Sequence, residues 1–449
     1  MAGSRRRRRL RRQRARAAAA VRDLPPEPTP KPEPERVSIL DHLPPDLLAE
    51  IHRRVDAFRD RFYFALACSA SGHPFTPEAP WLVLPGKGQE WVTLLSIAND
   101  EDIVNVRTSA PAMRDYVVVG SSGGLLVTAD ALGALRMVNP VTGAQADLPA
   151  ITASPVFHSP FCIDSDAFLE IRYGGLPPPV SMGRTMTLAA FQMRQWFYRK
   201  VVLSASSCPG NYAAMLITGE TFGVPAFVSS EDAVWRMAPS YDGVEDAIHH
   251  DGRFYSVTYT GDVEAWDRNV ETGEFTSTVV APRLAIDDVN KPQRKYLAAA
   301  MDGRLMAVIK YSRVVEQVSY HYGHRSCEKV TQVFFKVWIL DKERRRWEEE
   351  EDIGDAAIFV GVNGSLCVST TEYPRIRAGC IYFTDDDLGE ASLRRHGNQG
   401  CSYMYDGRDD DELRFIGKYS LENDMAETIH ELAHHRCWPP AAWIKPSVL

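Results

Sequence analysis

The chain of 449 residues lacks the features that mark membrane and secreted proteins. It has no run approaching the roughly 18 consecutive apolar residues of a membrane-spanning helix, and the charges at its N-terminus are not followed by an apolar segment as long as the h-region of a signal peptide. Its eight cysteines lie far apart without a CxxC pair, which favours reduced thiols packed as small apolar residues. We therefore expect a nuclear and/or cytoplasmic protein without a membrane partner.

The sequence also lacks most signatures of catalysis, with no Gly-x-Ser-x-Gly sequence and no evident pair of nucleophile and base. The H-E-x-x-H motif does occur, at His430-Glu431-Leu432-Ala433-His434, where a helix would hold zinc with the glutamate as general base. Residues 435–449 contain no Asp or Glu as a third ligand, and Pro439 and Pro440 would end a helix soon after the motif. We interpret the match as fortuitous and expect no catalytic residue, metal or cofactor.

Three other clusters of potential metal ligands are interpreted in the same way. His321, His324 and Cys327 have ligand-like spacing, but they lie in a polar insertion without a fourth ligand, so we expect a solvated loop. The acidic runs Asp385–Asp387 and Asp409–Glu412 lack the alternating spacing and central glycine of a calcium-binding EF-hand loop. We expect both runs to be solvated acidic turns.

Positive charge is concentrated at the N-terminus. Residues 1–22 contain ten arginines and no acid, which leaves 41 basic against 59 acidic residues in the rest of the chain, a net charge of −18. An acidic body argues against nucleic-acid binding, because neutralising phosphates requires a basic surface. The arginine-rich tail stays open to several interpretations: a nuclear-import signal, an arm that binds nucleic acid non-specifically, an organellar transit peptide or a disordered extension.

Composition then divides the chain into three parts. Residues 23–36 alternate proline with charge, which favours an extended polyproline II spacer. Residues 1–37 are therefore predicted to be a disordered arginine-rich tail and a proline-rich linker. We assign residues 38–86 to a small helical domain and residues 87–449 to a single, mainly β domain.

The helical domain is predicted from two amphipathic segments. Pro45 suits the first position of a helix and is followed by Leu47, Leu48, Ile51 and Val55 at helical spacing. A second helix is predicted over residues 59–70. Two such helices bury little area alone, so they either cap the domain that follows or dock on the helices of a partner.

Residues 87–449 are predicted to be a β-propeller. From Tyr116 to Leu148, three short runs of apolar β-formers are separated by turns, the first at Gly123-Gly124 and the last at Asn139–Gly143. Similar units of strand, tight turn and strand recur downstream. A lone sheet of this size is only marginally stable, and about 40 to 50 residues per four-stranded blade predict six or seven blades. The strand Trp81–Leu84 is expected to pair with a strand near Trp443 and close the ring.

A series of motifs carries a resemblance to a known family. Leu43–Ile51, followed by a helix with Ala67-Cys68 and by Trp81–Pro85, resembles an F-box. The later motifs are Asn139–Gly143, Asp251–Tyr255, Gly261–Val263, Val337–Trp347, Cys380–Asp385 and Trp443–Pro446. In this order they resemble the large plant family that pairs an F-box with a KIB-type, kelch-like β-propeller.

This resemblance implies a non-enzymatic, substrate-recruiting subunit of an SCF-type cullin ubiquitin ligase. In such a subunit the F-box binds a Skp-family adaptor, and the propeller presents a target protein for degradation. The resemblance and the helical spacing together predict the adaptor-binding residues, which are Leu43, Pro44, Leu47, Leu48 and Ile51. The target-binding residues are not predicted.

One departure from the family pattern weakens the predicted docking. Family F-boxes tend to read Val-Cys-x-x-Trp, whereas this chain reads Ala67-Cys68-Ser69-Ala70-Ser71. Loss of a large aromatic anchor removes on the order of a few kcal/mol of packing, so we expect weakened adaptor binding. Two alternatives stay open: a propeller interaction scaffold with a non-docking F-box, and a propeller enzyme, since fold alone does not determine function.

Overall fold

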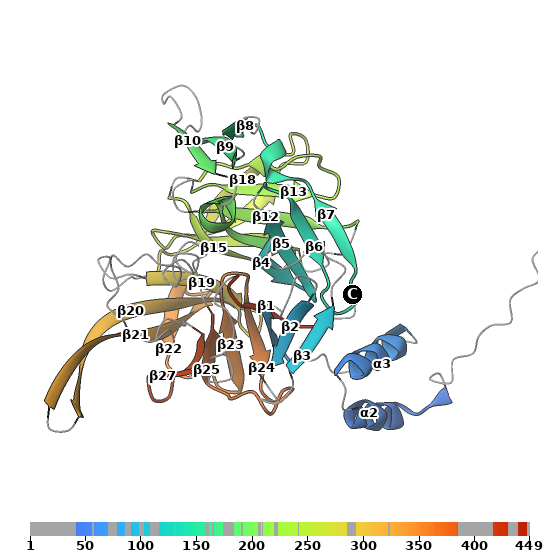
Figure 1. The fold of residues 1–449 in the computed structure, drawn as a ribbon, viewed down its shortest axis with the longest axis vertical. Coiled ribbons are helices and arrows are strands. Elements are labelled where there is room, and N and C mark those ends of the chain that lie inside the picture. Colours follow the sequence, from blue (N-terminus) through green and yellow to red (C-terminus); the bar gives the residue numbers. More distant parts are fainter. Residues whose placement is uncertain are drawn as a thin grey trace, which may run out of the picture.

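The computed structural model in Figure 1 shows a ring of β-sheets with a pair of short helices beside it. The structure describes residues 42–55, 58–70, 79–85, 91–97, 103–107, 116–130, 132–157, 161–163, 166–173, 184–189, 192–204, 208, 210–219, 223–240, 242–284, 293–321, 324–384, 416–429 and 439–446. The predicted tail and linker at 1–37, the H-E-x-x-H motif and both acidic runs lie outside these residues. None of the helices in the described ranges is long and apolar enough to cross a membrane.

Six sheets form the ring, which confirms the predicted propeller and sets the number of blades at six. Blade 1 contains β28 (Ala442–Ile444), β1 (Trp81–Pro85), β2 (Trp91–Ser96) and β3 (Ile103–Arg107). Blade 2 contains β4 (Tyr116–Ser122), β5 (Leu125–Asp130), β6 (Leu135–Val138) and β7 (Gln145–Leu148). Blade 3 contains β11 (Tyr198–Leu203), β12 (Ala213–Thr218), β13 (Pro225–Ser229) and β14 (Arg236–Met237).

The remaining blades complete the ring. Blade 4 contains β15 (Val244–His250), β16 (Arg253–Thr258), β17 (Val263–Arg268) and β18 (Phe275–Ala281). Blade 5 contains β19 (Gln293–Ala299), β20 (Leu305–His321), β21 (His324–Asp341) and β22 (Arg346–Glu350). Blade 6 has five strands in the order β24 (Ser365–Ser369), β23 (Ala356–Val360), β25 (Cys380–Phe383), β26 (Gly417–Ser420) and β27 (Met425–Thr428).

A seventh sheet lies outside the ring, because the inner strands of blades 2 and 3 contact each other directly. Strand β4 packs against β11, so no blade stands between them. The extra sheet consists of β8 (Phe161–Ile163), β9 (Asp166–Tyr173) and β10 (Arg184–Ala189). Leu169 and Ile171 of β9 join the core that blades 2 and 3 share. The sheet therefore covers the ring rather than extending it.

Turn chemistry explains why the strands reverse where they do. Gly123 and Gly124 have φ of 53° and 81° between β4 and β5, a backbone that favours glycine. Between the third and fourth strands of blade 2, the buried side chain of Asn139 accepts hydrogen bonds from the backbone N–H of Val141 and Thr142, at 3.0 and 3.1 Å. Asn269 makes the same turn in blade 4. These side chains replace backbone partners and fix the register of the outer strands.

The ring closes between its two ends, as the sequence predicted. Strand β28 pairs antiparallel with β1, with Leu82 opposite Trp443. Strand β1 lies within the segment 38–86 that was assigned to the helical domain, and its pairing places it in the propeller, which therefore includes Trp81. Closure leaves β1 paired on both sides, with β28 and with β2, and β28 also contacts β4 of blade 2.

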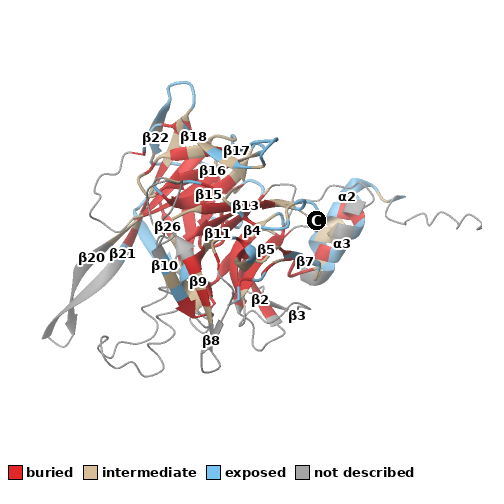
Figure 2. Cartoon of the chain, turned by 90° about the horizontal axis from the view of Figure 1, so that it is seen from above, coloured by how far each residue is buried: buried red, intermediate tan, exposed pale blue. Residues whose placement is uncertain are grey.

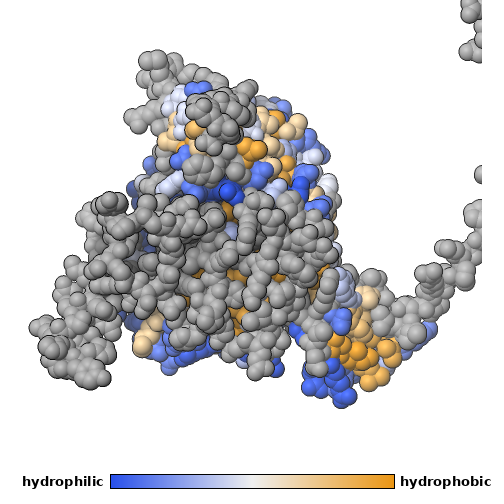
Figure 3. Space-filling model, in the orientation of Figure 1, coloured by the Kyte–Doolittle hydropathy of each residue, from blue (hydrophilic) through white to orange (hydrophobic). Residues whose placement is uncertain are grey.

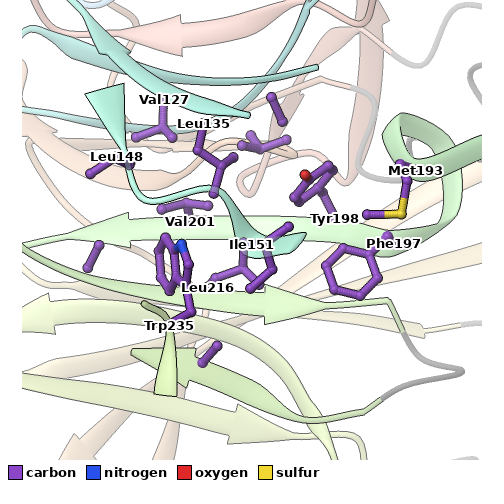
Figure 4. Packing of buried hydrophobic residues seen from close by; sticks show 14 of the residues in the cluster. Val127, Leu135, Leu148, Ile151, Met193, Phe197, Tyr198, Val201, Leu216 and Trp235 are labelled. Atoms are coloured by element: carbon purple, nitrogen blue, oxygen red, sulfur yellow. The ribbon is translucent and has the colours of Figure 1, made fainter. Parts of the chain in front are cut away.

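Clusters of buried apolar residues fill the interfaces between blades. Figure 2 shows that buried residues predominate along the strands of the ring. The cluster in Figure 4 joins blades 2 and 3, where Leu135, Ile151 and Val201 face Trp235. Trp235 is buried, and its indole N–H donates to the carbonyl of Pro149 at 2.6 Å. A continuous set of such interfaces makes each blade depend on its two neighbours.

The polar segment around His321 is a strand ending rather than the predicted loop. His321 is the last residue of β20, and His324 to Cys327 begin β21, paired in register with His321 to Val318. The two strands extend well away from the ring (Figure 1). Cross-strand hydrogen bonding satisfies the polar backbone here, so low hydrophobicity does not prevent strand formation. In the described part of the chain, no three His, Cys, Asp or Glu side chains group as a metal site.

Candidate functional site

Helix α2 (Pro45–Arg54) begins where the sequence predicted. The carbonyl of Pro44 accepts hydrogen bonds from the N–H groups of Leu47 and Leu48, at 3.0 and 3.1 Å, and starts the helix. Proline costs nothing at the first helical position, because its missing N–H would have no partner there. The last turn is basic and Asp46 is in the first, which suits the helix dipole at both ends.

The predicted adaptor stripe divides between the surface and the interior. Leu47 and Ile51 are one helical turn apart and are 51% and 38% exposed, whereas Leu48 is 1% exposed. Pro44 is also exposed, and Leu43 is half-buried. The side chains of Leu47 and Ile51 are therefore available to a partner, while Leu48 holds the helix from inside. Docking through the five residues stays a prediction.

Helix α3 (Phe58–Ala70) attaches the helical pair to the propeller. Phe62 is buried in a cluster with Trp81 and Val83 of β1 and Val118 of β4. Helices α2 and α3 contact each other, and the rings of His52 and Phe64 lie 6.4 Å apart. The pair is thus fixed to blades 1 and 2 on one side, and Figure 3 shows hydrophobic surface over the helices on the other.

The missing aromatic anchor of the family pattern falls at Ser71, one residue beyond α3 and outside the described residues. Cys68, three positions earlier, is fully buried. Burial raises the pKa of its thiol, which suits a packed, neutral side chain. Cys68, which corresponds to the cysteine of the family pattern, is therefore packed in the interior.

A second candidate site, which the sequence analysis missed, lies on the inner strands of blades 3, 4 and 5. Six charged side chains meet there, two from each strand: Arg199 and Lys200, Glu245 and Asp246, Arg294 and Lys295. Each pair occupies the second and third positions of its strand. That repeated placement of charged pairs in otherwise apolar inner strands was a signal visible in the sequence.

Short contacts tie these charges together. Lys200 Nζ lies 2.7 Å from Asp246 Oδ1, and Lys295 Nζ lies 2.6 Å from Glu245 Oε2. The guanidinium groups of Arg199 and Arg294 each lie 3.7 Å from Glu245 Oε1. Burial raises the pKa of the Glu245 carboxyl, and the charges of Lys295 and Arg199 partly offset this rise. Paired charges allow these groups to stay buried where isolated ones would not.

A further ionic contact joins the outer strands of blades 3 and 4 through Asp232. Its carboxylate accepts hydrogen bonds from the N–H and hydroxyl of Ser229, at 2.9 and 2.6 Å, and pairs with Arg236 and Arg268, at 3.3 and 3.0 Å. Burial alone would raise its pKa, but these hydrogen bonds and charges outweigh burial, so the pKa of Asp232 lies below its ordinary value.

Asp232→Asn is therefore expected to lower the free energy of unfolding by about 2 kcal/mol at pH 7, since hydrogen bonds to a charged group are lost. A carboxyl whose pKa is depressed by folding stabilises the protein above the unfolded pKa of about 3.9, and this contribution disappears as pH falls through the folded pKa. Urea midpoints from pH 7 to pH 3 should show the difference from wild type shrinking with acid. A constant difference would contradict this, and Asp267→Asn at an exposed pair serves as control.

Comparison with known proteins identifies the family. The KIB1-4 beta-propeller family model matches residues 94–406. The F-box protein At2g17036 of Arabidopsis thaliana is 25% identical over 239 residues, which cover 52% of this chain and 53% of that protein. The putative F-box protein At4g17565 of the same plant is 22% identical over 361 residues, 76% of this chain and 82% of that protein. The chain thus spans about half the length of the first relative.

Among solved structures, the β-propeller domain of Cps50 (Swd1) from Myceliophteria thermophila covers 60% of this chain and 95% of its own, with 10% identity and a TM-score of 0.26. The six-bladed fold is therefore assigned from the pairing of the strands in the chain itself and not from this similarity. The family match covers most of the chain, and the related proteins carry F-box names. Because the family model matches more than half of its length, the chain belongs to the KIB1-4 beta-propeller family.

Proposed function

We propose that this chain is the substrate-recruiting subunit of an SCF-type cullin ubiquitin ligase. In this role α2 docks on a Skp-family adaptor and the propeller holds a target protein. One observation carries the proposal: the helical pair α2 and α3 packs on the propeller with one face and exposes apolar side chains on another. Phe62 fixes the pair to the propeller, and Leu47 and Ile51 remain exposed on the helix where the adaptor-binding residues are predicted.

This arrangement suits an adaptor subunit in two ways. An exposed apolar pair on one helical face is what a helix-binding partner requires, because burial of each large apolar side chain contributes about 1.5–3 kcal/mol. A rigid attachment through Phe62 would hold the target at a fixed distance from the ligase. A target that is positioned in this way meets the ubiquitin-carrying enzyme without a large loss of entropy.

One alternative has an observation in its favour. The chain has Ser71 where the family F-box has tryptophan, and an interaction scaffold that no longer docks on a ligase would tolerate that loss. The two functions differ in whether a cullin associates with the chain. A tagged full-length chain, purified from plant cells, is expected to bring down both the Skp adaptor and a cullin. Recovery of propeller-bound proteins without either component would favour the scaffold.

We also propose a nuclear and/or cytoplasmic location. Cys68, Cys208, Cys367 and Cys380 are free thiols among the described residues. Burial raises the pKa of Cys367 to about 11, which keeps this thiol neutral. Free buried thiols suit a reducing compartment. A fluorescent fusion of the full chain should therefore appear in the nucleus, the cytoplasm or both, and accumulation in the secretory pathway would contradict the proposal.

A further inference from the structure

The inner-strand charge cluster of blades 3, 4 and 5 carries more positive than negative charge. Among the described residues, Arg199, Lys200, Arg294 and Lys295 pair with two carboxylates, those of Glu245 and Asp246. Lys310 of β20 lies opposite Arg294 in the sheet register and is itself buried. Side chains directly opposite each other in an antiparallel pair share one face of the sheet. Lys200, Arg294, Lys295 and Lys310 are thus buried and Arg199 is partly buried, beside the carboxylates of Glu245 and Asp246.

Arg294 is the least satisfied member of this cluster. Its side chain is 9% exposed, and its Nε and Nη1 atoms have no hydrogen-bond partner among the described residues. The contact of Nη1 with Glu245 at 3.7 Å is an ion pair but too long for a hydrogen bond. Glu245 is already held by Lys295, through its ammonium group at 2.6 Å and its backbone N–H at 3.1 Å. A buried guanidinium without acceptors is costly, so it indicates a missing partner.

We propose that this cluster binds a phosphate group at the end of the ring where β11, β15 and β19 begin. A phosphate carries about −1.5 to −2 charge and several acceptor oxygens, so it supplies more acceptors for the unpaired donors of Arg294 than a single carboxylate does. Arginine and lysine are the side chains best suited to phosphate. Arg294 supplies the donors that lack an acceptor, and Arg199 and Lys310 supply nearby charge. The site is independent of adaptor docking.

Calorimetric titration of the full-length chain with inorganic phosphate tests the proposal, with chloride at equal ionic strength as the blank. The wild-type chain should bind phosphate, and Arg294→Gln should weaken binding at least about tenfold, because hydrogen bonds to a charged group are lost. Arg304→Gln is the matched control, since Arg304 lies in the same blade with an exposed side chain and pairs with Asp302 at the surface. The arginine-rich tail is present in all three proteins, so the difference between variants isolates the charge cluster.

Two results would overturn the site: no binding by the wild-type chain beyond the chloride blank, or equal binding by Arg294→Gln and wild type. Glutamine removes the unsatisfied charge, so the variant should melt no lower than wild type when phosphate is absent. If Arg294→Gln fails to fold, Lys310→Met serves as the second variant, with weaker binding expected and unchanged binding contradictory.

A parallel titration with a short acetylated peptide that contains one phosphoserine distinguishes the source of the phosphate. Tighter binding of the peptide than of inorganic phosphate, lost in Arg294→Gln, would assign the site to a phosphorylated protein segment. Tighter binding of inorganic phosphate, also lost in the variant, would assign it to a free anion. If Arg294→Gln weakened neither ligand, the site would be rejected.

Discussion

Trp443→Ala is expected to lower the free energy of unfolding by about 3–5 kcal/mol, which is the cost of removing a fully buried aromatic side chain. Trp443 lies in β28, the strand that closes the ring on β1. Its ring meets Phe359 of blade 6 edge-on at 5.0 Å, and its indole N–H donates to the carbonyl of Val360 at 3.0 Å. The substitution therefore removes contacts between blade 1 and blade 6 next to the pairing of β1 with β28.

Asn363 adds to the effect, because it binds the backbone of the same residue. Its side-chain amide accepts from Trp443 N–H at 3.0 Å, donates to the Trp443 carbonyl at 2.6 Å and donates to the Ser121 hydroxyl at 2.7 Å. Three blades are thus joined at the closure, so loosening β28 affects all of them. Urea unfolding of the full chain measures the change.

Trp196→Ala is the matched control for the closure prediction. Trp196 is 44% exposed, so its removal leaves no comparable cavity and should change the urea midpoint little. If Trp443→Ala were no more destabilising than Trp196→Ala, the ring would not depend on β28. Deletion of residues 440–449 removes β28 and should lower the melting temperature. An unchanged melting temperature would also contradict the predicted closure.

Leu47→Asp combined with Ile51→Asp is expected to weaken adaptor binding about a hundredfold or more. Each substitution places a charge where an apolar contact is proposed, and hot-spot residues of interfaces commonly contribute at least about 2 kcal/mol each. Both side chains are exposed, so the free energy of unfolding should change by less than about 1 kcal/mol. Binding by titration and unfolding by urea, measured on the same preparation, separate docking from folding.

The control for this prediction is a double variant that places the two negative charges on the propeller instead of on α2. Leu132 and Met301 are exposed to a similar degree, at 52% and 53%. Leu132→Asp combined with Met301→Asp should leave adaptor affinity unchanged, although it adds the same negative charge. Equal loss of binding in both double variants would mean that charge, rather than the α2 surface, controls the association.

Local signals in the sequence predicted the blades well, because each blade is made of neighbouring segments joined by tight turns. Gly123-Gly124 and Asn139–Gly143 mark the ends of strands whatever surrounds them. Closure of the ring was also predicted, since a strand outside the repeats at each end needs a partner. The number of blades needed the structure: the sequence predicted six or seven, and the contact of β4 with β11 places the sheet of β8 to β10 outside the ring.

Two features could not be predicted from the sequence because they depend on tertiary contacts: which residues of the α2 stripe are exposed, and the charge cluster on the inner strands. Leu47 and Leu48 both fit a helical stripe, yet adjacent residues point about 100° apart, and only the folded structure shows that Leu48 is the buried one. Arg294 and Glu245 look like surface residues by type, because charged residues are rarely buried. They are buried here because the ring brings three inner strands together and lets opposite charges meet.

The molar mass of the full-length chain mixed with a plant Skp-family adaptor tests the central claim most directly. Size-exclusion chromatography with light scattering should show one species that contains one copy of each protein, and the Leu47→Asp, Ile51→Asp variant should elute apart from the adaptor. Two separate peaks for the wild-type chain and the adaptor at micromolar concentration would contradict the ligase-subunit account and favour the scaffold.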